Sequence, residues 1–317
     1  MDVVTIGETM VLFTPKSSPL MRYAETYSRQ FGGAETNFAI GLTRLGHQAG
    51  WISKVGNDEF GKSMLSFIRG EGVNVSQVEF DPTAPTGMYF KEVRSGNQVR
   101  VQYYRKGSAA SQLQPSDLNE EYIAGAKYLH VTGITPALSE SCYQTILRAI
   151  SIAKENDVKV IFDPNLRRKL WSEDHSRKVL LEIAALSDII LPGLDEGTFL
   201  FNEEDPIKLG ELFLKQGASL VVLKIGAKGA YYFTEEEYQL IPGFPVTNVV
   251  DPVGAGDGFA AGLISGLLEG LPLDQAVAKG NGVGAMVTMV PGDFEGLPDS
   301  EELKAFMEFT SSEDVAR

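Results

Sequence analysis

The sequence predicts an α/β protein whose mostly parallel central sheet is covered by helices on both faces and carries a small inserted β-lid. Three observations support this fold class. After residue 107, apolar strand-length runs alternate with amphipathic stretches of helix length, which is the pattern of βαβ units. The runs at residues 160–162 and 220–223 are apolar throughout, as strands buried on both faces are. Before residue 107, two consecutive predicted strands, without a helix between them, interrupt this pattern.

The elements of the main layer are predicted in chain order. The first strand is Val3–Ile6, followed by a helix over residues 37–45 and a strand over residues 51–55. Further strands are predicted at Tyr128–Thr132 and at residues 158–163, 189–192, 220–225 and 231–233. The helices between them include Glu140–Glu155 and residues 176–185 and 206–216. Because connections between parallel strands are right-handed, these units form one doubly covered sheet.

The β-lid is predicted from residues 9–29 and 86–105, which do not fit this alternation. Residues 86–93 and 98–105 are predicted as two strands, joined by a turn containing Ser95, Gly96 and Asn97 that favours a hairpin. A surface hairpin without a function is the alternative. The α/β body then takes residues 1–8, 30–85 and 106–310, and residues 311–317 are expected to form a frayed tail.

Composition narrows the class of protein. A hydrophobic content of 43% is that of a globular protein, and no apolar run is long enough to cross a bilayer. The net charge of −14 argues against nucleic acid and against an anionic membrane surface as partners. The N-terminus starts directly as a strand without a basic flank, and Cys142 has no second cysteine to pair with. We therefore expect a cytoplasmic protein in which Cys142 is inert core.

The segment at residues 248–262 carries the strongest functional signal. An apolar strand end leads into a turn with Gly254 and Gly256, and Asp257 then opens a helix of small and apolar residues. The free amides of a helix start favour an anion, and a carboxylate in the same turn can accept a proton from an attacking hydroxyl. Transfer of a phosphoryl group to an alcohol needs this pairing. A purely structural turn, with Asp257 favoured by the helix dipole, is the alternative.

Other polar residues follow predicted strands, and ligands of open parallel sheets bind at the carboxyl ends of strands. These positions are residues 32–37, 163–167, 195–196, 226–229 and 254–257. The glycines at 254–262 match neither the P-loop nor the dinucleotide-binding fingerprint, because no Gly-Lys-Ser/Thr follows them and their spacing differs from G-x-G-x-x-G.

Two of these segments resemble motifs of the ribokinase-like carbohydrate kinases, the PfkB family. Residues 32–37, Gly-Gly-Ala-Glu-Thr-Asn, are similar to the family's sugar-binding motif, and residues 251–257, Asp-Pro-Val-Gly-Ala-Gly-Asp, to its C-terminal motif. The resemblance covers nearly the whole chain and implies ATP-dependent phosphorylation of a sugar hydroxyl. The strings at residues 103–109, 130–136, 163–167 and 292–296 are similar to those of family members that act on 2-keto-3-deoxygluconate. Such members phosphorylate its terminal (6-) hydroxyl to give 2-keto-3-deoxy-6-phosphogluconate.

The resemblance also implies roles for single residues. Asp257 would be the general base, and the backbone amides of Gly254, Ala255 and Gly256 would form the anion hole. The implied substrate ligands are Gly33, Asn37, Tyr89, Tyr103, Arg105, Arg167 and Asp293. The implied nucleotide ligands are Asn165, Arg167, Lys224, Gly226, Lys228, Gly229, Gly254, Gly256 and Asn281. Glu196 would hold Mg²⁺ through water, although Gly193 stands where the family usually has an asparagine.

Arg105 is the residue that suits an acid substrate best, since its planar fork matches a carboxylate. Tyr103 shares its strand face, and Tyr104 points the other way, as alternation along a strand requires. The alternatives are a solvated edge-strand charge for Arg105, a surface arginine for Arg167 and a loop-turn carboxylate for Asp293. Glu35 and Lys106 are expected to be structural or rim residues.

Three other functions remain open at this point. The first is another sugar kinase of the family, a fructokinase or a kinase for a galacto-configured keto acid. The second is a non-catalytic sugar-acid sensor, suggested by Gly193. The third, a nucleotide-linked oxidoreductase, is disfavoured because no glycine fingerprint follows the first strand. The expected partners are a sugar acid and ATP, with no nucleic acid and no membrane, and the strand edges of the lid make a homo-oligomer plausible.

Overall fold

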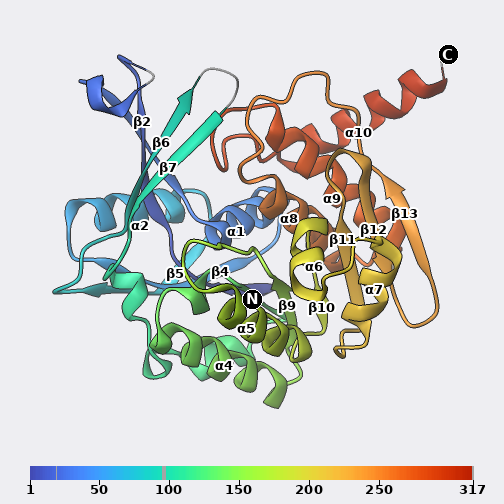
Figure 1. Cartoon of the computed structure of the whole chain (residues 1–317), viewed down its shortest axis with the longest axis horizontal. Helices are drawn as coiled ribbons and strands as arrows, with labels where there is room; N and C mark the ends of the chain where they lie inside the picture. The colour runs from blue at the N-terminus through green and yellow to red at the C-terminus, as the bar shows by residue number, and fades with distance from the viewer. Residues whose placement is uncertain (19, 95–97, 316–317) are drawn as a thin grey trace.

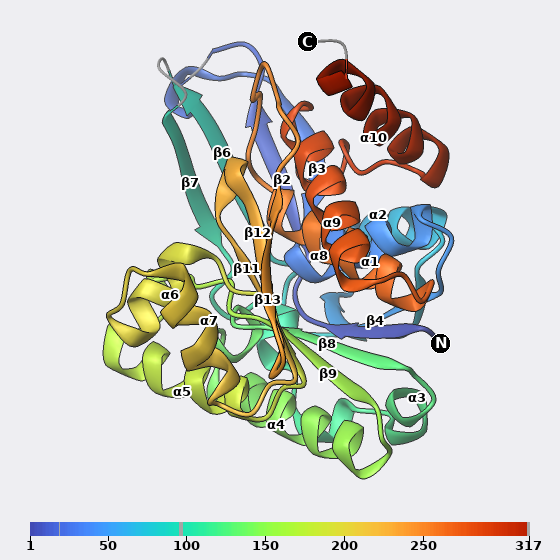
Figure 2. The same cartoon turned by 90° about the vertical axis from the view of Figure 1, so that its right-hand side faces the viewer.

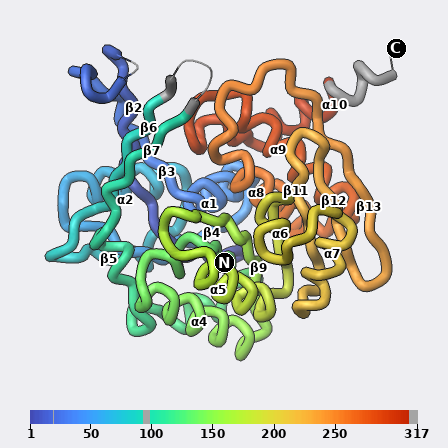
Figure 3. Tube along the Cα trace, in the orientation of Figure 1, coloured from blue at the N-terminus to red at the C-terminus, as the bar shows by residue number. Residues whose placement is uncertain are grey.

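The computed structural model describes residues 1–18, 20–94 and 98–315, and it has an α/β body from which a smaller sheet projects (Figure 1). The remaining residues are drawn as a thin grey trace in Figure 1, and Figure 3 follows the course of the chain as a tube. The predicted turn at Ser95, Gly96 and Asn97 therefore lies outside the described residues.

The central sheet has nine strands within the described chain, in the order β13-β12-β11-β10-β9-β8-β1-β4-β5. Strands β5, β4, β1, β8, β9, β10 and β11 of this sheet are parallel to one another. At one edge, β12 and β13 are added in antiparallel pairing. Their bounds are β1 Val3–Ile6, β4 Ala49–Gly56, β5 Asn74–Asp81, β8 Tyr128–Thr132, β9 Lys159–Asp163, β10 Ile189–Ile190, β11 Leu220–Lys224, β12 Gly229–Phe233 and β13 Tyr238–Pro242.

Helices cover both faces of this sheet (Figure 2). On one face lie α1 Ala34–Arg44, α2 Glu59–Gly70, α8 Ala255–Leu268 and α9 Leu273–Thr288, and on the other α3 Glu120–Ala124, α4 Glu140–Glu155, α5 Glu173–Ala185, α6 Leu194–Phe201 and α7 Pro206–Leu214. Alternate strand residues enter two separate cores: Ile161 packs with α1, α8 and α9, whereas Val160 and Phe162 pack with α4, α5 and α7. The two-sided burial expected from the apolar runs is confirmed.

The lid is a four-stranded sheet in the order β3-β2-β6-β7. Its strands are β2 Met10–Pro15, β3 Tyr27–Gly32, β6 Met88–Arg94 and β7 Gln98–Tyr104. β2 pairs parallel to β6, which joins the two separate segments of the chain into one sheet. The predicted fold class, a mostly parallel sheet with a small β-lid, is confirmed; β3 continues to Gly32, three residues past the predicted end of the lid segment.

The C-terminal helix α10 covers Ser300–Val315, so the predicted tail at residues 311–317 is helical as far as Val315. Cys142 is buried in α4, and burial raises the pKa of its thiol to about 11, which fits an inert core residue. Within the described chain, each helix is too short or too polar to traverse a lipid bilayer.

Candidate active site

A cleft of about 720 Å³ lies between the lid and the carboxyl ends of the parallel strands. Its lining comes from strands β6 and β7 of the lid, from the loops after β1, β9 and β10, from the end of β11, and from the start of α8. The sequence-predicted residues that line it are Gly33, Asn37, Tyr89, Tyr103, Arg105, Asn165, Arg167, Glu196, Lys224, Gly254, Gly256, Asp257 and Asp293. Residues more than 200 positions apart thus meet in one site.

Asp257 lies in the first turn of α8 and faces this cleft. Asn37, in the first turns of α1, donates a hydrogen bond from Nδ2 to Asp257 Oδ2 at 2.8 Å. Asn165 Nδ2 is 3.5 Å from the other carboxylate oxygen, Oδ1. A carboxylate can accept further hydrogen bonds beside these two, and Asp257 lines the cleft. Asn37 and Asn165 therefore contact the candidate base itself.

The environment of Asp257 changes its acidity. Burial raises the pKa of Asp257 from 3.8 to about 7, and the negative charge of Asp163 acts in the same direction. The hydrogen bond from Asn37 and the charge of Arg167 oppose this shift. A carboxylate whose pKa lies near neutral pH is a far better proton acceptor than an ordinary aspartate.

The turn before Asp257 presents free backbone donors. Gly254 is the N-cap of α8 and has a positive φ of 80°. Within the described chain, the amides of Gly254 and Gly256 make no protein hydrogen bond, and that of Ala255 makes only a long one, 3.4 Å, to Pro252 O. These donors point from a helix start, where an anion is favoured.

Lys224 adds a positive charge beside these donors. It stands at the end of β11, and a Cβ added to Gly256 would lie 3.7 Å from Lys224 Nζ. Asp163 Oδ2 holds the ammonium at 2.7 Å. Burial alone would lower the pKa of Lys224, but the carboxylates of Asp163 and Glu196 raise it above its ordinary value, so the lysine is charged.

Glu196, the predicted magnesium residue, serves as a cap in the structure. Its Oε2 accepts a hydrogen bond from Gly193 N at 2.7 Å, and its Oε1 accepts one from Leu166 N at 2.8 Å. Burial, with the nearby charge of Asp163, raises the pKa of Glu196. The side chain thereby ties the loop after β9 to the start of α6.

On the lid side, Arg105 has a protein partner. Its Nε and Nη2 atoms lie 2.6 and 2.5 Å from Glu8 Oε2, and Ser108 Oγ donates to Glu8 Oε1 at 2.5 Å. The guanidinium also lies over the ring of Tyr103, 5.6 Å from its centroid. Arg105 is buried, so the alternative of a solvated edge charge is wrong. One edge of its fork is occupied by Glu8, and within the described residues Nη1, on the other edge, makes no protein hydrogen bond.

Some predicted nucleotide residues lie beside the cleft rather than in its lining. Gly226 and Lys228 form the short 3₁₀ turn that follows β11, and Gly229 begins β12. Asn281 is buried in α9, where Nδ2 donates to the carbonyl oxygens of Ile241 and Pro242 at 3.1 Å. In this structure Asn281 joins α9 to the edge strand β13.

Glu8 and Lys91 are two of the lining residues that were not singled out from the sequence. Glu8 lies two residues after the end of the first strand, so the rule that ligands bind at strand ends would have found it. Lys91 lies on β6 two residues after Tyr89 and therefore on the same strand face. That spacing was a usable signal for Lys91.

Comparison with known proteins agrees with this geometry. Residues 1–300 match the model of the pfkB family carbohydrate kinases, and the chain belongs to this family. It is therefore a carbohydrate kinase, an enzyme that transfers a phosphoryl group to a sugar hydroxyl.

Individual relatives show which members of the family the chain resembles. The chain is 40% identical to a 2-dehydro-3-deoxygluconokinase of Bacillus subtilis over 97% of this chain and 95% of that protein. It is 35% identical to a probable chloroplastic fructokinase-6 of Arabidopsis thaliana, over 94% and 80% of the two chains. Among solved structures, a putative ribokinase II of E. coli in complex with ATP and Mg²⁺ superposes with a TM-score of 0.89 at 28% identity, covering 97% of this chain and 99% of that one.

The pKa of Asp257 predicts how activity depends on pH. If Asp257 must be ionised, kcat/KM should fall about tenfold for each pH unit below a midpoint near 7 and level off above it. Initial rates between about pH 5 and 9 at saturating magnesium measure this profile. Asn37→Ala removes the hydrogen bond that lowers the pKa, so the midpoint should move to higher pH. A profile that is flat across neutral pH would contradict the assignment.

Proposed function

We propose that this protein is an ATP-dependent kinase that phosphorylates the terminal hydroxyl of 2-keto-3-deoxygluconate. The observation that carries the proposal is the position of Asp257, whose carboxylate lies beside the free amides at the start of α8 and the Lys224 ammonium. The chain is similar to a 2-dehydro-3-deoxygluconokinase. Because 2-dehydro-3-deoxygluconate is another name for 2-keto-3-deoxygluconate, this similarity supports the choice of substrate.

In the proposed reaction, Asp257 accepts the proton of the acceptor hydroxyl as its oxygen bonds to the γ-phosphorus of ATP. The bond between that phosphorus and the β–γ bridging oxygen breaks, and ADP leaves. The amides of Gly254, Ala255 and Gly256, with Lys224, stabilise the negative charge on the transferred group. A loose transition state requires little early activation of the nucleophile, which suits a carboxylate base.

Magnesium fits this site only as an ion held mainly by the nucleotide. Within the described residues, no cluster of three or more His, Cys, Asp or Glu side chains could hold a metal ion. Both carboxylate oxygens of Glu196 already accept backbone amides, and we propose that Glu196 contacts the ion through water. When bound with ATP, Mg²⁺ neutralises part of the charge of the phosphates.

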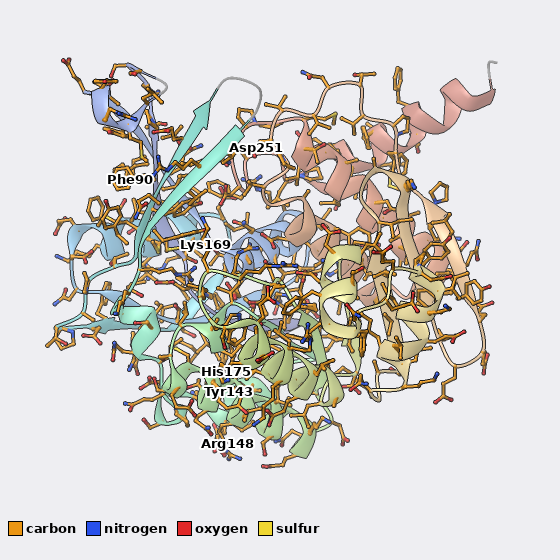
Figure 4. The ribbon with its side chains drawn as sticks, viewed as in Figure 1. Phe90, Tyr143, Arg148, Lys169, His175 and Asp251 are labelled. Atoms are coloured by element: carbon orange, nitrogen blue, oxygen red, sulfur yellow. The ribbon has the colours of Figure 1, made fainter. Side chains whose placement is uncertain are left out.

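The acid substrate would lie between the lid and the body. Arg105 offers the second edge of its guanidinium, and Arg167 lines the cleft from the loop after β9. Tyr89 and Tyr103 stack at 5.7 Å between ring centroids on the lid, and Gly33 and Asn37 contribute the body side. Lys169 of the loop after β9, which is labelled in Figure 4, also lines the cleft.

A fructokinase is the second candidate, and one observation favours it. Glu8 already neutralises Arg105, which weakens the attraction of this arginine for a substrate carboxylate. A site with this ion pair suits a neutral sugar as well as a sugar acid. A relative described as a probable fructokinase has 35% identity. The deciding experiment compares ADP formation with 2-keto-3-deoxygluconate, its galacto-configured epimer, fructose, ribose and gluconate. The highest kcat/KM on fructose would overturn the proposed substrate.

The role of Arg105 gives a separate prediction. Arg105→Lys keeps the charge but loses the planar fork, so KM for the keto acid should rise about 10- to 100-fold while KM for ATP stays within about twofold. Lys106→Ala, at the exposed next residue, is the matched control and should leave both values unchanged. An equal rise in KM for fructose and for the keto acid would exclude the carboxylate role.

We also propose that two copies of the chain associate through the outer face of the lid. An aromatic cluster formed by Phe13, Tyr27, Phe60, Phe90 and Tyr104 covers this face, and Tyr104 is 59% exposed. Figure 4 shows Phe90 on the side of the lid away from Asp251. We expect light scattering to give the mass of a dimer and Tyr104→Asp to give a monomer. A wild-type monomer would refute this association.

A further inference from the structure

A buried group of charges joins the lid to the body at the anion-hole turn. Lys91 extends from β6 and is 4% exposed. Its ammonium forms an ion pair with Asp251 Oδ2 and lies 3.9 Å from Asp293 Oδ1. Both carboxylates are buried, and they belong to two different loops of the body. One lid cation therefore bridges two body segments.

These two loops shape the turn that carries the anion-hole amides. Asp251 Oδ1 accepts a hydrogen bond from Val253 N at 3.2 Å, immediately before Gly254. Its Oδ2 accepts a longer one, 3.4 Å, from Gly292 N of the second loop. The loops also touch through their backbones, since a Cβ added to Gly254 would collide with Asp293 O. The carboxylate that holds Lys91 thus organises the approach to Gly254.

The same group reaches the acceptor side of the cleft. Tyr89, on the lid face that lines the cleft, donates a hydrogen bond from its hydroxyl to Asp293 Oδ2 at 2.7 Å. Within the described residues, Asp293 Oδ1 accepts no hydrogen bond, and the Lys91 ammonium lies 3.9 Å from it. A chain of contacts therefore runs from Tyr89 through Asp293 and Lys91 to Asp251.

Such an arrangement is stable only when all its members are together. A buried charge that loses its partner is strongly disfavoured, because it keeps the cost of leaving water and loses the attraction that offsets it. If the lid moved away from the body, Lys91 and both carboxylates would have to be rehydrated. The position of the lid and the arrangement of the turn at residues 251–254 are then coupled, so that a shift in one shifts the other.

We propose that Lys91 is a positioning residue that couples closure of the lid over the acceptor to formation of the anion hole. This inference rests on the proposed phosphoryl transfer in the cleft, but not on the identity of the sugar. An acceptor that contacts Tyr89 favours the closed lid. The closed lid places Lys91 on Asp251, which arranges the Gly254 turn for the phosphates. Acceptor and nucleotide should therefore bind cooperatively.

The test measures this cooperativity in the whole protein. Titration calorimetry gives Kd for adenylyl imidodiphosphate, a non-hydrolysable ATP analogue, with and without the acceptor that the wild type phosphorylates fastest. In the wild type, the acceptor should tighten the analogue about 5- to 150-fold. In Lys91→Met this factor should fall to about 1, with kcat reduced at least about tenfold and Kd for the analogue alone within about twofold.

The controls separate positioning from stability. Arg100→Met, an exposed residue on the neighbouring strand β7, should keep the wild-type factor. Lys91→Arg, which retains the charge, should recover part of it. If Lys91→Met does not fold, the double variant Lys91→Met/Asp251→Asn removes both charges and carries the same expectation.

Wild-type cooperativity and kcat in a folded Lys91→Met protein would overturn the inference, as would a wild type without cooperativity. Failure of the wild type to phosphorylate any acceptor would instead overturn the proposed function.

Discussion

Replacement of Asp257 by asparagine should lower kcat by about 10²- to 10⁴-fold while leaving ATP binding nearly unchanged. The amide has almost the shape of the carboxyl group and can accept the same hydrogen bond from Asn37, but it cannot take a proton from the acceptor hydroxyl. Steady-state kinetics and calorimetric titration with ATP measure the two quantities separately. Turnover at the wild-type rate in a folded Asp257→Asn protein would refute the assignment of the base.

The same variant has a stability signature that checks its folding. The pKa of Asp257 is about 7 in the folded protein, against an ordinary 3.8, so the folded state binds the proton more tightly than the unfolded state. The resulting stability is present below about pH 4 and is lost as pH rises through about 7. The substituted amide carries no charge at either pH, so Tm of the variant should exceed that of the wild type at about pH 8, and the difference should shrink in acid.

Gly254→Ala should have the second large effect. Gly254 has a φ of 80°, and an added Cβ would collide with the carbonyl oxygen of Asp293, so the backbone itself must move. We expect a loss of more than about 2 kcal/mol in the free energy of unfolding, because an alanine is strained at positive φ and here also meets a fixed backbone atom. A displaced turn should also lower kcat by about 10²-fold, the effect of losing an anion-hole donor.

Gly256→Ala is the matched control for stability. Its added Cβ would meet only the flexible end of Lys224, at 3.7 Å, and its backbone lies inside α8. Chemical denaturation should therefore show a change within about 1 kcal/mol, since alanine is also the better helix former. Equal losses of stability in the two variants would contradict the close contact between the two loops.

The large sheet was predictable because its central strands are apolar on both faces. β1, β8 and the helix Glu140–Glu155 were predicted with their observed bounds. The edge strands β5 and β13 were not predicted, because each has a half-exposed or exposed face and therefore lacks the continuous apolar run. Residues 34–36 were missed at the start of α1, where a glycine N-cap offers no side-chain capping signal.

The residues of the site were easier to predict than the contacts that they make with one another. Motif position identified Asp257 and Asn37, but not the hydrogen bond between them across 220 residues of chain. Arg105 was expected to hold a substrate carboxylate, and in the structure its first partner is Glu8. Nothing in local spacing shows which of several buried acids a given cation will meet, since that depends on how the lid sits on the body.

The central position of β1 has a consequence for synthesis of the chain. β1 is hydrogen-bonded to β4 on one side and to β8 on the other, and β8 ends at Thr132. A nascent polypeptide shorter than this leaves one edge of its first strand without a neighbour, and both faces of this strand are buried in the finished fold. Such an edge invites pairing with another chain. Until about two fifths of the polypeptide has left the ribosome, protection of this strand falls to chaperones or to transient local structure.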